Sequence, residues 1–390
     1  MSRLDGEQIV AEALEAAGSD ELGPDDWREG YDRLLHSFVH EAGLSELGVE
    51  VVRAELVGYL TNRASVIAWD RAHPTEVSGA VTAPLVIVGQ PRTGTTILFD
   101  LLAQDPAFRV PLTWEVDKPV PPPETPTYDT DPRIDEVQAT LDLAETVMPG
   151  FTTFHPMGAR LGQECVRFTA MTFRSMIFPI QYRVPSYNRW FLHEADLAPA
   201  YRWHRRYLQH LQSRHPGDQW LLKSPAHLWH LDALAAEYPD AVVVQTHRDP
   251  LVVVASVSAL ATHLRRMASD EGSLQEVSQQ YAEDIVDGLQ RGMEARERGV
   301  LPASQFVDVH FSSFVKDPIG TVAQLYDALG RELTPEVESR MRTFLAEHPG
   351  DGGGSGKRYR FSDTGLDADS LRAKAKAYQE RYDVSSEVLT

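Results

Sequence analysis

The chain has 390 residues, and 42% of them are hydrophobic, which is enough to form a large core. Acidic residues outnumber basic ones by 57 to 37, so the formal net charge is −20. This charge excludes general nucleic-acid binding, because contacts to phosphate need a basic surface. The one cysteine, Cys165, excludes an internal disulfide and is typical of a small buried hydrophobe in a reducing compartment.

The sequence shows no targeting or membrane signal. Residues 1–10 are charged and lack the apolar core of a signal peptide, and no apolar run approaches the roughly 20 residues of a membrane span. We therefore expect a soluble, cytoplasmic protein without an integral membrane segment. The sequence does not determine the oligomeric state.

Residues 1–80 carry apolar side chains at helical spacing, which predicts a helical N-terminal extension. Its longest helix is predicted from Leu47 to Ala72, where His73-Pro74 stops it. Nothing in this segment is typical of catalysis. Residues 81–390 are predicted to form the main α/β domain.

The stretch from Pro84 to Leu102 predicts a buried strand (Leu85 to Val88), a tight loop (Gly89 to Gly94) and a helix that starts near Thr95. Backbone N–H groups at such a helix N-terminus are free to bind an anion, and the helix dipole favours negative charge. The alternative is an ordinary strand-to-helix turn.

The middle of the chain predicts a loop and then helices. Residues 119–126 contain five prolines and must be extended. Residues 131–215 are predicted to be a mostly helical insertion, whose aromatic residues form either core or an apolar acceptor pocket. These residues are Phe168, Phe173, Phe178, Tyr182, Tyr187, Trp190, Phe191, Tyr201, Trp203 and Tyr207.

From residue 219 onward, strands alternate with helices. Strands are predicted at 220–222, 241–246 and 305–310, with helices at 251–266 and 319–329. This spacing predicts a P-loop-like, mainly parallel sheet flanked by helices. The tail, residues 350–390, contains a Gly-rich loop (350–356), then Lys357 and Arg358, and a last helix over about 369–382.

The loop resembles a phosphate-binding Walker A motif but departs from it. Gly89 and Gly94 have the required spacing, yet Thr95 stands where that motif has Lys, and the cation is Arg92 inside the loop. A Mg²⁺-dependent NTPase would also need an acidic residue at the end of a second strand, where this chain has His247-Arg248. These departures argue against a P-loop nucleotide kinase or NTPase, which is the alternative prediction.

Arg248 and Ser256 indicate a second anion site. Arg248 ends a predicted strand, and Ser256 lies about two turns into the following helix. Both could contact one anion at the start of that helix. A nucleotide with phosphates at its 5′ and 3′ ends is the natural ligand for two such sites.

At this point the sequence resembles the PAPS-dependent sulfotransferases (donor 3′-phosphoadenosine 5′-phosphosulfate), in particular a bacterial group with a Pro-Arg-x-Gly-Thr-Thr loop. The resemblance covers most of residues 80–385. The matching residues are 89–96, Asp105-Pro106, Trp114-Glu115, 222–225 with His227, 247–250 with Ser256, and Lys357-Arg358-Tyr359 followed by 365–367.

The resemblance implies roles for these residues. Arg92, Thr93, Gly94, Thr95 and Thr96 would hold the 5′-phosphosulfate. The 3′-phosphate would be held by Arg248 and Ser256, and Lys357 and Arg358 would belong to the C-terminal cofactor loop. Many relatives have Lys at Arg92 and Trp at Ile97, so the adenine contact is not assigned. PAPS is the co-substrate, and no metal is expected if the cations stabilise the leaving group.

Two residues are candidates for the base that takes the acceptor proton. Glu115 lies 23 residues after Arg92, where relatives with an Arg-containing loop have a catalytic Glu. His227 follows Lys223 in a Lys-Ser-Pro-Ala-His pattern, two residues longer than the Lys-x-His of the cytosolic small-molecule enzymes. We favour Glu115, and Lys223 is a candidate to assist the leaving group.

The sequence thus predicts transfer of a sulfuryl group from PAPS to a hydroxyl or amine, with release of PAP. The acceptor is a small molecule, a lipid or a glycan. A non-catalytic nucleotide-binding protein is a further alternative, and it predicts PAP binding without transfer.

Overall fold

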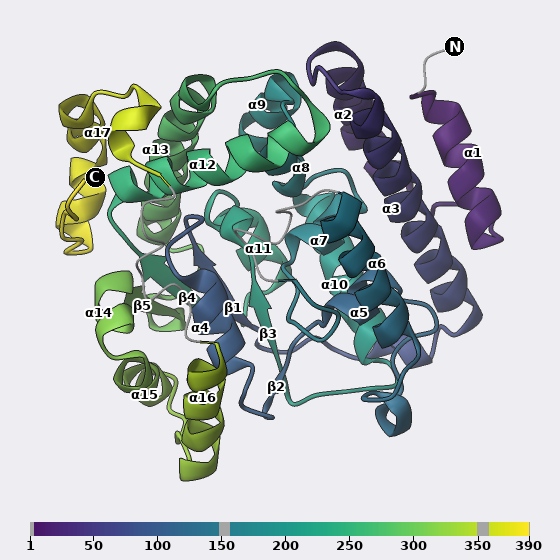
Figure 1. The fold of residues 1–390 in the computed structure, drawn as a ribbon. Coiled ribbons are helices and arrows are strands. Elements are labelled where there is room, and N and C mark those ends of the chain that lie inside the picture. Colours follow the sequence, from purple (N-terminus) through teal and green to yellow (C-terminus); the bar gives the residue numbers. More distant parts are fainter. Residues whose placement is uncertain (1–3, 148–156, 349–358, 390) are drawn as a thin grey trace. The chain divides into compact units, whose positions relative to one another are not determined.

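The structure, a computed structural model, describes residues 4–147, 157–348 and 359–389 (Figure 1). The chain forms two compact units. Unit 1 comprises Met1–Val81, Pro111–Gly217 and His263–Gly272, and unit 2 comprises Thr82–Val110, Asp218–Thr262 and Ser273–Thr390. The helices of the predicted N-terminal extension therefore belong to the same unit as most of residues 111–217.

Unit 2 is built on a five-stranded sheet in the order β2-β3-β1-β4-β5, and every strand pair is parallel. The strands are β1 (Leu85–Gly89), β2 (Phe108–Arg109), β3 (Gln219–Lys223), β4 (Val242–His247) and β5 (Phe306–His310). The central strand β1 is buried along its whole length, which explains its continuous apolar sequence. The predicted mainly parallel α/β architecture is confirmed.

The helices of unit 2 follow the strands in a βα alternation. They are α4 (Thr95–Leu102), η4 (Pro225–Leu228), α11 (Leu231–Glu237), α13 (Leu274–Arg298), η5 (Ala303–Gln305), α14 (Phe311–Lys316), α15 (Pro318–Ala328), α16 (Pro335–Glu347), η6 (Phe361–Thr364) and α17 (Ala368–Arg381). The helix α12 (Pro250–Ala268) begins in this unit. Figure 1 shows α17, in yellow, beside α13, with which it is in contact.

One apolar core holds this sheet to its helices. Leu85 and Ile87 of β1 pack with Phe99 of α4, Val322 of α15 and Met341 of α16. The core fixes the start of α4 relative to the end of β1, and so it fixes the loop between them.

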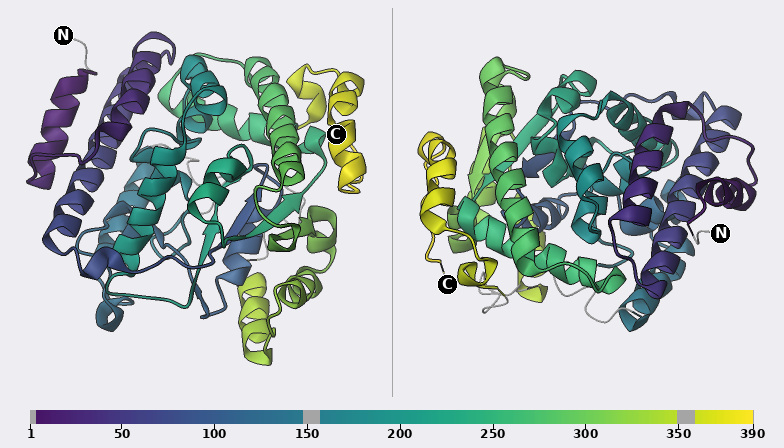
Figure 2. Two further views of the ribbon diagram at one scale, coloured as in Figure 1. Left: turned by 180° about the vertical axis from the view of Figure 1, so that it is seen from behind. Right: turned by 90° about the horizontal axis from the view of Figure 1, so that it is seen from above.

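Unit 1 is helical in the part of the chain that the structure describes. Its elements are α1 (Gly6–Ala17), η1 (Asp25–Trp27), α2 (Arg28–His40), α3 (Glu46–Ala72), η2 (Glu76–Ser78), α5 (Thr113–Asp117), η3 (Thr125–Thr127), α6 (Arg133–Val147), α7 (Val166–Ala170), α8 (Ile177–Gln181), α9 (Pro185–His193) and α10 (Ala198–Gln212). Figure 2 shows the purple α1 running along α3. The long helix predicted over 47–72 is confirmed as α3.

The aromatic residues of 168–207 are core residues. All ten are buried, and their rings contact one another: Phe178 meets Tyr187 edge-on at 5.8 Å, and Phe168 stacks on Tyr207 at 5.2 Å. Cys165 is also buried, as predicted. Of the two interpretations of this aromatic segment, core or acceptor pocket, packing in the core explains these contacts without a ligand.

Among the described residues, one helix, α12, is long and apolar enough by composition to cross a membrane. This run was not anticipated from the sequence. In the structure 67% of that stretch is buried, as is usual for a helix in a protein core.

Candidate active site

The candidate site of unit 2 lies at the carboxyl ends of three neighbouring strands. β1 is flanked by β3 on one side and β4 on the other, with Ile87 level with Lys223 and Gly89 level with Thr246. The chain leaves β1 toward β2 and β3 and later returns to β4 on the opposite side. Open α/β sheets bind their ligands outside the strand ends at such a reversal.

The loop between β1 and α4 has an unusual backbone. Gly89 and Gly94 have φ values of 142° and 87°, and Arg92 has a φ of 69°. At Gly89 a Cβ would lie 2.2 Å from the Thr246 hydroxyl, and at Gly94 it would lie 2.8 Å from the Phe311 ring. Glycine is therefore required at both positions, because any side chain would collide with Thr246 or Phe311 and strain the backbone.

Hydrogen bonds fix this loop from inside. The Thr93 hydroxyl donates to the Gln90 carbonyl at 2.6 Å and lies 2.6 Å from the Thr246 hydroxyl. The first N–H of α4 with a partner in the helix is Leu98, which donates to the Gly94 carbonyl. The N–H groups of Thr95 and Thr96 thus have no acceptor within the helix, which is the arrangement that binds anions.

Lys223 brings a cation to the same helix start. It ends β3, is buried, and donates from Nζ to the Thr96 hydroxyl at 3.0 Å. Its neighbour Ser224 donates its backbone N–H to the Ile87 carbonyl, which ties the end of β3 to β1. His227 lies in the next turn, η4, which packs beside β1, and it is buried.

Arg92, Ser256 and Arg248 lie together. The Arg92 Nε donates to the Ser256 hydroxyl at 3.1 Å, and an Arg248 Nη donates to the Arg92 carbonyl at 2.9 Å. The Arg248 guanidinium also lies 4.0 Å from the centre of the Phe311 ring. The two predicted anion sites are therefore joined, because the Arg92 side chain lies beside a residue expected at the other site.

Arg248 and its neighbour Asp249 are both held by the C-terminal part of the chain. The Glu387 carboxylate accepts from Nε and Nη2 of Arg248 at 2.9 and 3.1 Å. The Asp249 carboxylate accepts from both terminal nitrogens of Arg372 at 2.6 and 3.0 Å, and from the backbone N–H of Leu251 at 3.0 Å. The last of these bonds caps the N-terminus of α12.

His247 forms a buried hydrogen-bonded group behind Arg248. One ring nitrogen lies 2.8 Å from an Asp308 oxygen and the other 2.8 Å from the Tyr378 hydroxyl. Arg296 donates to both oxygens of Asp308. Since a carboxylate only accepts, Nε2 carries the proton toward Asp308 and Nδ1 accepts from Tyr378.

Burial governs the charge state of this group. It lowers the pKa of His247 below its ordinary value, although Asp308 acts in the opposite direction. Burial alone would raise the pKa of Asp308, but hydrogen bonds from His247 and Arg296, together with the positive charge of Arg296, hold it well below its ordinary value. We conclude that His247 is neutral at neutral pH and that Arg296 keeps Asp308 ionised.

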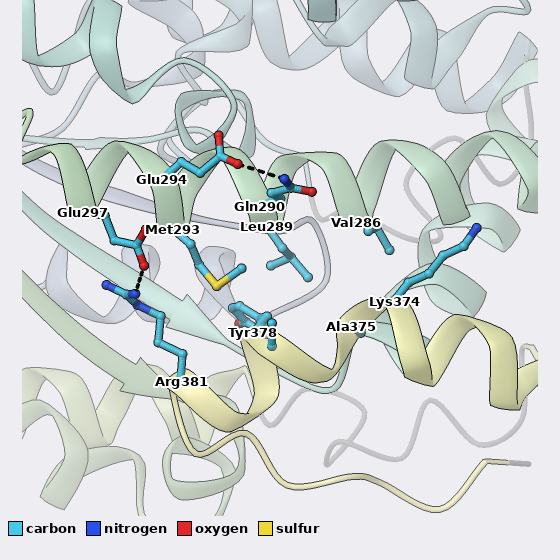
Figure 3. Close-up of a pocket in the computed structure, with 11 residues that line it drawn as sticks. Val286, Leu289, Gln290, Met293, Glu294, Glu297, Lys374, Ala375, Tyr378 and Arg381 are labelled. Carbon is cyan, nitrogen blue, oxygen red and sulfur yellow. Dashed lines mark hydrogen bonds and ion pairs between the residues drawn. The ribbon is translucent and has the colours of Figure 1, made fainter.

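The helix α17, which supplies Tyr378, is fixed against α13. Figure 3 shows Leu289 and Met293 of α13 facing Tyr378 of α17, with an ion pair between Glu297 and Arg381 nearby. This packing holds the Tyr378 hydroxyl at His247, and the chain after α17 leads to Glu387.

Glu115 belongs to unit 1, where it is buried in the short helix α5. Its Oε1 accepts from the backbone N–H of Leu112 at 2.8 Å and from the Tyr128 hydroxyl at 3.2 Å. The Tyr128 ring in turn stacks on His215, with centroids 3.8 Å apart. The carboxylate is therefore fixed at one oxygen by two donors.

The remaining contacts of α5 keep this short helix in place. Asp117 accepts from Arg167 at 2.6 Å, and its carbonyl accepts from Asn62 at 3.0 Å. The Val116 carbonyl accepts from the buried Tyr207 hydroxyl at 2.7 Å. A helix of five residues needs such support, because it is too short to be stable alone.

Comparison with known proteins assigns the family. A model described as "Sulfotransferase family" matches residues 84–335, more than half of the chain and including the loop, Lys223 and Arg248. The chain belongs to the sulfotransferase family. It is 25% identical over 271 residues to omega-hydroxy-beta-dihydromenaquinone-9 sulfotransferase of Mycobacterium tuberculosis and of Mycobacterium bovis, covering 68% of this chain and 67% of each relative.

Solved structures of mycobacterial sulfotransferases have the same fold. Sulfotransferase STF9 of Mycobacterium avium superposes with a TM-score of 0.89 at 29% identity, covering 98% of this chain and 97% of that one. STF1 of Mycobacterium tuberculosis gives a TM-score of 0.84 at 32% identity, covering 95% and 98%. The protein is therefore a sulfotransferase enzyme, as the sequence predicted.

The structure of this sulfotransferase brings together most of the predicted donor-site residues. Unit 2 holds Arg92 to Thr96, Lys223, His227, Arg248 and Ser256, whereas Glu115 lies in unit 1. Lys357 and Arg358 lie outside the described residues. The roles of all these residues stay predictions.

Sequence reasoning missed three features around Arg248: the partner Glu387, the pair of Asp249 with Arg372, and the His247 group. Asp249 was named only within the matching residues 247–250, and its adjacency to Arg248 was the one available signal. Nothing in the sequence indicates that Glu387 returns to Arg248, because the two residues are 139 positions apart.

Proposed function

We propose that this enzyme transfers a sulfuryl group from PAPS to a hydroxyl group of a small-molecule or lipid acceptor and releases PAP. The observation that supports the proposal is that the two predicted anion sites lie together at the carboxyl ends of neighbouring strands. One comprises the start of α4 with Lys223 and Thr96, and the other comprises Arg248 and Ser256. A donor with phosphates at both ends of one nucleoside fits such a pair.

The first site suits the 5′-phosphosulfate. Gly89 and Gly94 allow the loop its positive φ angles and its close approach to Thr246 and Phe311, and the backbone N–H groups of residues 92–96 would bind the anion. When bound, PAPS supplies an activated sulfuryl group on its 5′-phosphate. Lys223 and the loop amides stabilise the negative charge that grows on the bridging oxygen.

The second site suits the 3′-phosphate. The planar guanidinium of Arg248 offers two parallel donors, which match two oxygens of a phosphate. Ser256 adds a hydroxyl, and the Arg92 guanidinium adds positive charge beside it. Lys357 and Arg358 remain the predicted additional cations.

The acceptor proton needs a base, for which we propose Glu115. A new S–O bond forms to the acceptor oxygen, the bond from sulfur to the 5′-phosphate oxygen breaks, and Glu115 takes the acceptor proton. Oε1 of Glu115 accepts two hydrogen bonds, which hold the carboxylate in one orientation. His227 is the second candidate and is tested together with Glu115.

The name shared by two relatives supports a lipid acceptor. The menaquinone sulfotransferases of Mycobacterium tuberculosis and Mycobacterium bovis are named for an omega-hydroxy menaquinone, a hydroxylated lipid. We therefore rank hydroxylated lipids above glycans and amines as acceptors for this chain.

Substitution at each base candidate tests the proposal. We expect Glu115→Gln to lower kcat by about 100-fold or more while PAP binding, measured by calorimetry, stays within error of the wild type. His227→Ala is the matched comparison. If Glu115→Gln keeps normal turnover and His227→Ala does not, the base is His227. Stabilisation by ATP with Mg²⁺ in preference to PAP in a thermal shift assay would instead support a P-loop kinase or NTPase.

A further inference from the structure

Glu387 is bound to one edge of the Arg248 guanidinium with the geometry that a phosphate would have. Two carboxylate oxygens accept from Nε and Nη2 of Arg248 at 2.9 and 3.1 Å. This two-bond arrangement is the one that arginine offers to a carboxylate or a phosphate alike. Arg248 is 12% exposed and Glu387 is 36% exposed, so the pair is partly shielded from water, which strengthens it.

The chain around Glu387 is held in place independently of this ion pair. The Glu387 backbone N–H donates to Asp249 at 2.7 Å, and Asp249 is also paired with Arg372 of α17. Upstream, the Val384 N–H donates to the Gln379 carbonyl at 2.9 Å, and the Val384 carbonyl accepts from the Gln379 side chain at 3.0 Å. These hydrogen bonds therefore hold the backbone in a position that places the Glu387 carboxylate at Arg248.

We propose that Glu387 is an internal competitor for the 3′-phosphate of the donor nucleotide, and that it thereby sets the enzyme's affinity for 3′-phosphorylated nucleotides. The inference rests on the proposed function, which assigns Arg248 to that phosphate. One guanidinium edge cannot serve both anions, so the nucleotide must displace Glu387 before its 3′-phosphate binds.

This competition has a distinctive consequence. A phosphate dianion displaces a carboxylate because it carries more charge, but its binding free energy is reduced by the ion pair that it breaks. A nucleotide without a 3′-phosphate leaves the Arg248–Glu387 pair intact and is not affected. Glu387 therefore weakens PAP and PAPS selectively, and it favours release of the product PAP.

The test compares the binding of two nucleotides to the wild type and to two variants. PAP and 5′-AMP are titrated calorimetrically into the wild type, Glu387→Gln and Glu380→Gln. Glu380 is a matched control, because it is an exposed glutamate on α17 paired only within its helix to Lys376 in the described contacts, and its substitution removes the same charge. Thermal unfolding of each variant verifies that the fold is kept.

We expect Glu387→Gln to lower the Kd of PAP by about five-fold, as loss of a partly exposed ion pair implies, and to leave that of 5′-AMP unchanged. Glu380→Gln should change neither. An unchanged or higher Kd for PAP in Glu387→Gln, or equal tightening of both nucleotides, overturns the inference. Arg248→Gln distinguishes failure of the proposed 3′-phosphate site from failure of the proposed competition. If it does not weaken PAP, the proposed 3′-phosphate site is wrong; if it does while Glu387→Gln has no effect, only the competitor is wrong.

Discussion

Replacement of Gly94 by alanine tests the geometry of the loop most specifically. Gly94 caps α4 with a φ of 87° and a ψ of 11°, a left-handed conformation that L-residues avoid. An added Cβ would lie 2.8 Å from Cδ2 and 3.2 Å from Cε2 of Phe311. Gly94→Ala therefore imposes a backbone strain and a steric conflict at the same position.

The two costs can be estimated separately. The left-handed conformation costs alanine about 1–2 kcal/mol, and an overpacked contact costs about 1–3 kcal/mol, so the free energy of unfolding should fall by about 2–5 kcal/mol. Gly330→Ala is the matched control, since Gly330 has a φ of 65° but nothing within 4 Å of its added Cβ. It should lose about 1–2 kcal/mol, from the backbone alone.

The steric conflict should also weaken nucleotide binding at the donor site. The Phe311 ring lies 4.0 Å below the Arg248 guanidinium, so a displaced ring moves that guanidinium. We expect the Kd of PAP to rise about ten-fold in Gly94→Ala, a change that corresponds to about 1.4 kcal/mol, and to stay unchanged in Gly330→Ala. The assays are urea unfolding and calorimetry. If Gly94→Ala is no worse than Gly330→Ala in both assays, the close approach of Gly94 to Phe311 is not real.

Three further predictions address the base, the leaving group and pH. Tyr128→Phe keeps the ring but removes the hydroxyl that orients Glu115, so kcat should fall about ten-fold with KM for PAPS unchanged, a split that a purely structural defect would not give. Tyr182→Phe, which removes another buried hydroxyl donated to a glutamate, is the control and should lower only the melting temperature; equal kcat values for the two variants would contradict the positioning role. Lys223→Met should lower kcat about 10- to 100-fold, since the cation stabilises charge that grows during transfer; an unchanged kcat in single-turnover assays would exclude this role. His247 has a lowered pKa, so the unfolded chain binds a proton more readily, and stability present above about pH 6.5 should be lost as the pH falls. His247→Asn should show a smaller drop in unfolding free energy between pH 7.5 and 5.5, and an equally steep drop would refute this.

The sheet was predictable because its strands are short apolar runs that end abruptly. The runs at 85–88 and 220–222 appear as β1 and β3, lengthened by one and two residues, and the run at 241–246 appears as β4, shifted by one residue. Their last residues (Gly89, Lys223 and His247) break the apolar pattern where each strand reaches the candidate site. A parallel arrangement followed from the helices that separate them.

Other elements could not be identified in this way. The helices α13 and α16 were not identified from the sequence, although α13 is 25 residues long. The two anion sites were predicted to be separate, because sequence spacing alone gave no reason to place the Arg92 side chain at Ser256. The left-handed backbone of Arg92, which only the structure shows, directs the Arg92 side chain.

Glu387 illustrates the limit most clearly. It lies after the last helix, in a segment without periodicity or motif, and its importance depends on a contact 139 residues away. Long-range ion pairs are set by the tertiary fold, whereas sequence patterns report local structure. Glu115, by contrast, was a candidate because relatives with an Arg-containing loop have a catalytic Glu at about this point, and the structure adds the Leu112 and Tyr128 donors that hold it.

Transfer of labelled sulfate tests the central proposal most directly. Purified enzyme is incubated with PAPS carrying a radiolabelled sulfuryl group and with a lipid extract or a panel of hydroxylated compounds, and the labelled product is identified by mass. We predict a labelled sulfate ester and equimolar PAP with the wild type, and at most a trace with Glu115→Gln. Tight PAP binding without a labelled product from any acceptor would contradict sulfuryl transfer and would indicate a nucleotide-binding protein without this chemistry.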